Sequence, residues 1–156
     1  MFDHEKLDVY QLELKFLTWA TEFLVEVADV PSPVNKRELI DQLDRASLSA
    51  LLNTAEGNGR RQGKQRAKFF DDARGSAFEC AACLDASVAK KLSNVERIKA
   101  GKDLLERIVA MLSKLVERFD PQSYRVREEN AMGNAEDIED EDDDEDEDDS
   151  GGAGHP

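Results

Sequence analysis

Histidine and cysteine, the residues most often used for metal binding and nucleophilic catalysis, are scarce in this chain: 156 residues contain two of each. The histidines, His4 and His155, lie at opposite ends of the sequence, so a Ser-His-Asp or Cys-His arrangement is not expected. Phosphate loops, dinucleotide fingerprints and HExxH motifs are also missing. We therefore expect a protein that is not an enzyme, acts on no small-molecule substrate and needs no metal or cofactor.

The two cysteines, Cys80 and Cys83, form a CxxC pair. Such a pair can bind zinc, but the terminal histidines do not supply the further ligands that zinc requires. Redox-active pairs lie at the start of a helix, where the thiolate is stabilised, whereas this pair lies between alanines in the middle of an expected helix. We expect both side chains to pack in the core.

Long apolar runs are missing as well. The first residues, MFDHEKLDVY, contain no basic region followed by an apolar run, so no secretory signal is expected. No stretch offers the roughly 20 consecutive apolar residues of a transmembrane helix. The sequence predicts a cytoplasmic protein without a membrane partner.

The charge is unevenly distributed along the chain. The formal net charge is -14, with 35 acidic and 21 basic residues. From Glu128 onward there are 15 acidic residues and no Lys or Arg, which leaves 20 acidic against 21 basic residues in 1–127. The body is therefore nearly neutral and the acidity belongs to a tail.

Four segments show the apolar spacing of helices, and no segment alternates as a strand would. They cover residues 9–28, about 36–57, about 63–91 and about 94–120. Each carries one apolar stripe, formed by Val9, Leu12, Phe16, Trp19 or Ala20, Phe23 and Val27; Leu39, Ile40, Leu43, Ala46, Ala50 and Asn53; Phe70, Ala73, Ala77, Ala81, Leu84 and Val88; and Ile98, Leu105, Ile108, Leu112, Leu115 and Phe119. The pattern predicts an all-α protein, an antiparallel up-down four-helix bundle.

Local signals refine the helix ends and contacts. Gly57 and Gly59 are expected to stop the second helix in the left-handed backbone that glycine accepts. Gly75, inside the third helix, costs roughly 1 kcal/mol relative to alanine, so we expect a neighbouring helix to approach closely there. Ser93 with Glu96 is expected to form a capping box for the fourth helix.

The helical pattern ends near Arg125, and residues 136–149 are almost all acidic. So many like charges without apolar partners cannot offset the entropy cost of ordering the chain. We therefore divide the chain into a bundle domain, residues 1–125, and a disordered acidic tail, residues 126–156.

A basic turn connects the second and third helices and consists of Arg60, Arg61, Lys64, Arg66 and Lys68. These cations could bind phosphates, with a salt dependence set by the counterions released. Alternatively, they form a solvated loop that pairs with Asp71, Asp72 or a neighbouring subunit. None lies beside an aromatic expected to be exposed for stacking.

Four polar residues on the second and third helices are expected to set the helix register. Asn53 and Glu56 lie one turn apart and should face the same neighbour. Arg45 falls roughly level with Glu79, which predicts an ion pair between them. Catalysis by these residues is the lesser alternative.

A longer motif runs through this region and comprises Gln42, Arg45, Ala46, Ser49, Asn53, Ala55, Glu56, Gly57, Gly59, Arg60, Phe69, Ala73, Gly75, Ser76 and Glu79. Through these residues the chain resembles the four-helix bundle family of the 23S rRNA intervening-sequence proteins. The chain departs from the family pattern at Gln62, Gln65 and Arg66, where family members commonly have Ser, Glu and an aromatic residue.

The resemblance implies a ring-forming homopentamer and a connection with RNA or a ribonucleoprotein, without implying a reaction. Combined with the basic turn, it suggests a non-enzymatic scaffold that binds structured RNA. The alternative is an adaptor for another protein that docks through the acidic tail and does not bind nucleic acid. The tail itself is open to three interpretations: a solubilising segment, a competitor for the basic turn, or a binder of polycations or metals.

Overall fold

The structure, a computed structural model, describes residues 1–136 and consists of helices joined by loops, with no strand in that range. Its elements are η1 (Asp3–Lys6), α1 (Asp8–Asp29), α2 (Arg37–Gly59), α3 (Gly63–Ala89), α4 (Val95–Phe119) and α5 (Pro121–Glu136). The predicted all-α class is confirmed. Within residues 1–136, no helix combines the length and apolar character needed to cross a bilayer.

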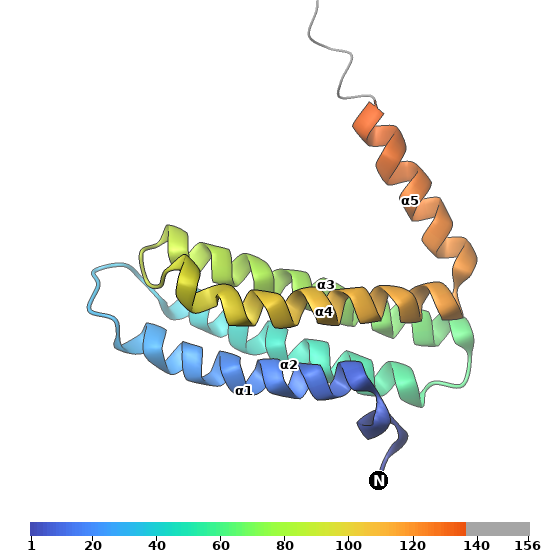
Figure 1. Cartoon of the computed structure of the whole chain (residues 1–156), viewed down its shortest axis with the longest axis horizontal. Coiled ribbons are helices and arrows are strands. Elements are labelled where there is room, and N and C mark those ends of the chain that lie inside the picture. The colour runs from blue at the N-terminus through green and yellow to red at the C-terminus, as the bar shows by residue number, and fades with distance from the viewer. Residues whose placement is uncertain (137–156) are drawn as a thin grey trace, which may run out of the picture. The chain divides into compact units, whose positions relative to one another are not determined.

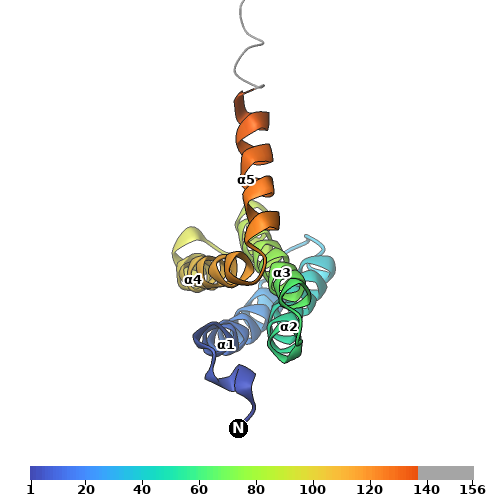
Figure 2. The same cartoon turned by 90° about the vertical axis from the view of Figure 1, so that its right-hand side faces the viewer.

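The four long helices, α1 to α4, form an antiparallel bundle (Figure 1). Each helix packs against two others, because α1 contacts both α2 and α4, and α3 contacts both α2 and α4. The view along the bundle shows the four helices around a common interior (Figure 2). The loops between them are short, and the turn between α2 and α3 lies at the same end of the bundle as the C-terminus of α4.

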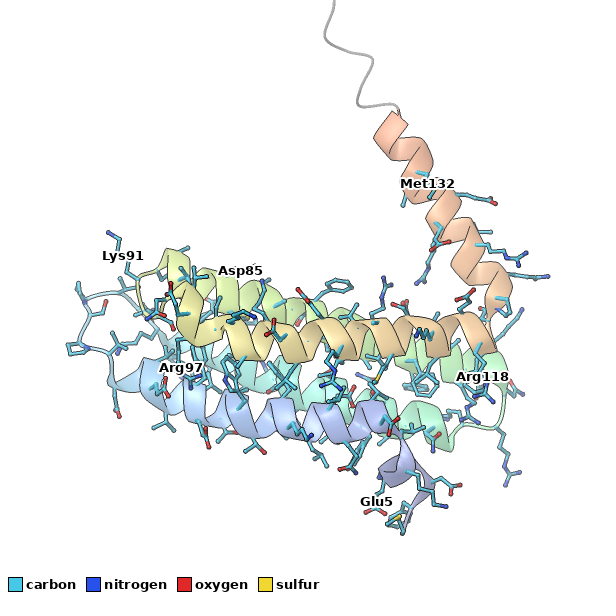
Figure 3. All side chains as sticks on the ribbon, in the orientation of Figure 1. Glu5, Asp85, Lys91, Arg97, Arg118 and Met132 are labelled. Carbon is cyan, nitrogen blue, oxygen red and sulfur yellow. The ribbon has the colours of Figure 1, made fainter. Side chains whose placement is uncertain are left out.

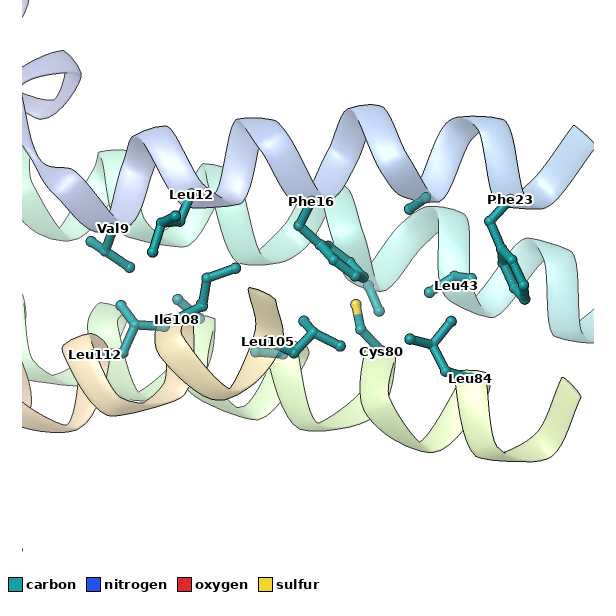
Figure 4. Close-up of a cluster of buried hydrophobic side chains, with 14 of the residues drawn as sticks. Val9, Leu12, Phe16, Phe23, Leu43, Cys80, Leu84, Leu105, Ile108 and Leu112 are labelled. Carbon is teal, nitrogen blue, oxygen red and sulfur yellow. The ribbon is translucent and has the colours of Figure 1, made fainter. Parts of the chain in front are cut away.

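The predicted apolar stripes form this interior (Figure 4). Side chains from all four long helices are less than one-tenth exposed and belong to one cluster, which includes Val9, Phe16, Phe23, Leu43, Phe70, Leu84, Leu105, Ile108 and Leu112. Burying such apolar surface contributes on the order of 25 cal/mol per Å² to folding. The core therefore follows directly from the helical spacing of the sequence.

Helices α1 and α4 approach closely at Gly101. A Cβ atom placed on Gly101 would lie 2.4 Å from Cζ3 of Trp19, so the glycine makes room for the indole ring. Trp19 stacks on Phe23 with ring centroids 5.0 Å apart. Arg97 lies over Trp19 and donates two hydrogen bonds of 2.7 Å to the carboxylate of Glu26, which lowers the pKa of that carboxylate (Figure 3). Arg97 and Gly101 together hold α4 against α1.

Two expectations about glycines prove wrong. Helix α2 does end at Gly59, as expected, but it continues through Gly57, and its C-cap is Arg60 in an extended conformation with φ -76° instead of a left-handed glycine. Gly57 is buried, and a Cβ there would lie 3.0 Å from Cβ of Phe69. This glycine therefore allows close packing of α2 and α3 and does not reverse the chain. A Cβ on Gly75 would meet nothing within 4 Å inside this chain, and the residue is exposed. The close approach expected at Gly75 occurs at Gly101 instead.

The start of α4 also differs from the expected capping box. The N-cap is Asn94, whose side chain accepts a hydrogen bond of 2.8 Å from the backbone N–H of Arg97. Asn is as good an N-cap as Ser, because its side-chain oxygen satisfies the same unpaired backbone donor. The cap therefore lies one residue later than Ser93.

A fifth helix, α5, covers residues 121–136, and its residues 126–136 belong to the segment that we expect to be disordered. Pro121 occupies its first position, where a missing N–H costs nothing. The helix has no apolar stripe, so the periodicity of the sequence could not reveal it. A unit boundary falls between Tyr124 and Arg125. The rest of the predicted tail, residues 137–156, lies outside the described residues.

Candidate nucleic-acid interface

The basic turn begins at the end of α2, where residues 60–62 connect α2 to α3. Gly57 lies against Phe69 and Phe70 at the start of α3, and a Cβ on Gly63 would lie 3.1 Å from the backbone oxygen of Phe119. The ends of α2, α3 and α4 therefore meet here. Such a junction holds the cations of the turn on a rigid support rather than on a long loop.

Arg60 has two partners within this chain. Its guanidinium donates a hydrogen bond to the carboxylate of Glu56, one helical turn earlier. The same guanidinium lies over the ring of Phe69, with its central carbon 4.8 Å from the ring centroid. The side chain nevertheless keeps 44% of its surface exposed.

Arg66 faces the junction of the helices. It donates a hydrogen bond of 3.1 Å to the side-chain oxygen of Asn58 and lies over the ring of Phe119, 4.3 Å from the ring centroid. Its Nε is buried and has no hydrogen-bond partner within residues 1–136. Arg66 therefore connects the ends of α2, α3 and α4 and is not free for a ligand in this arrangement.

The remaining cations of the turn are exposed. Lys68 lies 3.8 Å from the carboxylate of Asp72, but its side chain is 73% exposed, so the pair contributes little. Arg61 and Lys64 are both exposed, and no ion pair is formed by either within the described part of the chain. Arg61 and Lys64 are therefore cations of the turn that are exposed and have no carboxylate partner within residues 1–136.

Arg118 adds a cation that the sequence reasoning missed. It lies in the last turn of α4, and its guanidinium carbon is 5.3 Å from the centroid of the Phe119 ring, which Arg66 also covers (Figure 3). The position of Arg118 could have been predicted, since in an up-down bundle the end of the fourth helix lies beside the turn between the second and third helices. The basic surface is therefore wider than the turn alone.

The expected structural residues have mixed surroundings. Asn53 donates hydrogen bonds of 3.0 and 3.1 Å to the backbone oxygen and the hydroxyl of Ser49. The hydroxyl of Ser76 donates 3.0 Å to that of Ser49, which connects α3 to α2. Arg45 and Glu79 are both exposed, and no ion pair joins them among the contacts of residues 1–136.

The cysteines lie within α3. Cys80 is fully buried, and burial raises the pKa of its thiol to about 12 (Figure 4). Burial also raises the pKa of Cys83. Because the thiolate is the reactive form, both thiols are poor nucleophiles at neutral pH. In residues 1–136, no group of three His, Cys, Asp or Glu side chains could hold a metal ion.

A buried acid, Glu13, was also missed. It is 2% exposed between α1 and α2, and the hydroxyl of Thr54 donates a hydrogen bond of 2.6 Å to its Oε1. Its Oε2 has no hydrogen-bond partner within the described residues. Burial raises the pKa of Glu13 to about 8, while the Thr54 hydrogen bond acts in the opposite direction. Glu13 is adjacent to Leu12, which belongs to the predicted apolar stripe, but the sequence pattern gave no reason to expect a carboxylate to be buried.

Comparison with known proteins bears on the same region. The sequence model of the 23S rRNA-intervening sequence protein family matches residues 5–114. The matched segment includes α1, α2, α3 and most of α4, and therefore the whole basic turn. No curated protein matches the chain.

Proposed function

Because this chain belongs to the 23S rRNA-intervening sequence protein family, we propose that it is a non-enzymatic, ring-forming scaffold that binds RNA or a ribonucleoprotein through the basic turn. Arg61 and Lys64 carry the proposal, since both are exposed and unpaired within residues 1–136. Phosphate contacts from such side chains give affinity without a need for base recognition.

Self-association would multiply these contacts. Two leucines on α2, Leu48 and Leu52, lie one turn apart and are 47% and 56% exposed. Such an apolar surface suits contact with another copy of the chain. A ring would present several basic turns to one RNA, so that weak phosphate contacts act together through their high effective concentration.

The chemistry of the described residues agrees with a binding role. The name of the matching family refers to the intervening sequence of 23S rRNA and not to a reaction. The buried thiol of Cys80 is held protonated, and Glu13 is enclosed in the core away from any ligand at the surface. A scaffold needs neither group to react.

The salt dependence of RNA binding tests the proposal. We expect the double variant Arg61→Ala/Lys64→Ala to bind labelled RNA more weakly and to lower the slope of log K against log salt by about 1.4, since two phosphate contacts with a single strand are lost. The control, Lys15→Ala/Lys90→Ala, removes the same charge from exposed positions away from the turn and should leave the slope nearly unchanged. Equal slopes for both variants would contradict the proposed site.

The alternative is a protein adaptor that docks through its acidic tail. A form of the chain that ends at Arg127 distinguishes this adaptor from the RNA scaffold. This form keeps the bundle and loses 15 acidic residues. An RNA scaffold should bind at least as well without them, because phosphate repulsion is removed. If the shortened form fails to bind RNA at low salt, the scaffold function is wrong and the adaptor is favoured.

A further inference from the structure

Arg60 differs from the other cations of the basic turn because its guanidinium is held in place. Glu56 fixes it through a hydrogen bond from the preceding turn of α2, and Phe69 of α3 supports it from below at 4.8 Å. The charge of Arg60 is thus already matched by a carboxylate. A phosphate would therefore gain less from Arg60 than from Arg61.

The aromatic partner lies at the junction of α2 and α3. A methyl group on Gly57 would lie 3.0 Å from Cβ of Phe69, so the two helices approach closely where the Phe69 side chain begins. Lys68 also approaches this ring, with its ammonium nitrogen 5.4 Å from the ring centroid. An aromatic with two cations on it, which the sequence did not predict, therefore lies within the basic turn.

The guanidinium carbon of Arg60 lies over the Phe69 ring and the side chain is 44% exposed, so the residue is supported by an aromatic ring and remains accessible to solvent. Planar guanidinium groups stack on nucleobases, and proteins use such planes and aromatic rings to hold unpaired bases of single-stranded RNA. Base stacking of this kind tolerates any sequence, because every base has a π face.

We propose that Arg60, supported by Phe69 and oriented by Glu56, is a stacking platform for an unpaired base of single-stranded RNA. The neighbouring Arg61 and Lys64 contact the phosphates on either side of that base. This inference rests on the proposed function and adds the class of RNA: the ligand is single-stranded at the contact, since the bases of a duplex are stacked on each other and cannot reach the platform.

Two pairs of matched variants test the platform in the full-length protein. Arg60→Lys keeps the charge and removes the plane, while Arg61→Lys makes the same change at a phosphate contact. Phe69→Leu keeps every charge and keeps the Cβ that lies over Gly57. Its control is Phe78→Leu, which removes a 51% exposed ring that also lies under an arginine, Arg74 at 5.3 Å, elsewhere on α3. The probes are a labelled oligouridine of about 12 nucleotides and an RNA duplex of the same length.

We expect Arg60→Lys and Phe69→Leu each to weaken oligouridine binding by about fivefold to a hundredfold, the range for losing one stacked base. Arg61→Lys and Phe78→Leu should change it less than about twofold, because neither alters a stacked base. Duplex binding should not respond to Phe69→Leu. Circular dichroism melting checks folding, and Arg60→Lys still tests the platform if Phe69→Leu is unfolded.

Two other outcomes have distinct meanings. If oligouridine binds with a steep salt dependence and all four variants bind alike, the platform is wrong while the scaffold function stands. If neither RNA binds at low salt, the scaffold function is wrong, and the platform is wrong with it.

Discussion

Among the single residues, Glu13 makes the most direct link between pH and stability. It is buried against Thr54, and burial raises the pKa of its carboxyl from 4.5 to about 8. Below pH 4.5 the folded and unfolded states both hold the proton. As pH rises toward 8, the unfolded chain releases this proton while the folded chain keeps it, so the free energy of unfolding falls, by about 4 to 5 kcal/mol in total.

Glu13→Gln should remove this dependence. The amide cannot ionise, and its oxygen can still accept the hydrogen bond from Thr54. We expect urea denaturation between about pH 5 and pH 8 to show a steep loss of stability for the parent protein and a much smaller loss for the variant. The control Glu96→Gln changes an exposed carboxylate and should follow the parent. A parent protein with constant stability over this range would contradict the assignment.

Individual cations show why composition alone does not define a binding site. Five basic residues lie close together in the turn, and the sequence alone does not distinguish the paired ones from the free ones. In the folded chain Arg66 faces the ring of Phe119 and Arg60 is paired with Glu56, whereas Arg61 and Lys64 remain exposed. The difference comes from the contacts of each side chain: Arg60 pairs with Glu56 one turn earlier along the chain, whereas Arg66 contacts a residue on another helix.

At the scale of the helix, glycine has opposite roles in α3 and α4. Gly75 is exposed in the interior of α3 with open space around it, so it only lowers helix propensity. Gly101, inside α4, is required by the Trp19 ring, which stacks on Phe23 and lies under Arg97.

We therefore expect Gly75→Ala to stabilise the protein by about 0.5 to 1 kcal/mol and Gly101→Ala to destabilise it by about 1 to 3 kcal/mol. The second change forces a methyl group within 2.4 Å of the indole. Urea denaturation of both variants against the parent measures the difference. If Gly75→Ala were destabilising, and more so at higher protein concentration, the open side of Gly75 would instead belong to a contact between copies.

At the scale of the whole molecule, the exposed leucines of α2 are expected to hold copies together. The double variant Leu48→Lys/Leu52→Lys should shift the mass measured by light scattering toward the monomer while keeping the helical circular dichroism, because both side chains lie outside the core. Val25→Lys is the control, since Val25 is 60% exposed on α1. An unchanged mass for the double variant would remove this surface from the assembly.

The helices and the core were determined by the sequence itself. Apolar residues spaced three and four apart define a helix face whatever the rest of the chain does, so the stripes from Val9 to Val27 and from Ile98 to Leu112 could be predicted from local pattern alone. The helix α5 was missed for the same reason, because it has no such stripe.

Only the tertiary structure decided which polar residues are enclosed, paired or free. Phe119 covers Arg66, Thr54 meets Glu13, and Phe69 supports Arg60, and each of these partners comes from a different helix. Such contacts depend on the rotation and height at which whole helices pack, and the spacing of residues along one helix carries no information about its neighbour's register. The helical fold could therefore be predicted from periodicity, whereas packing between helices decided which cations of the basic turn are accessible.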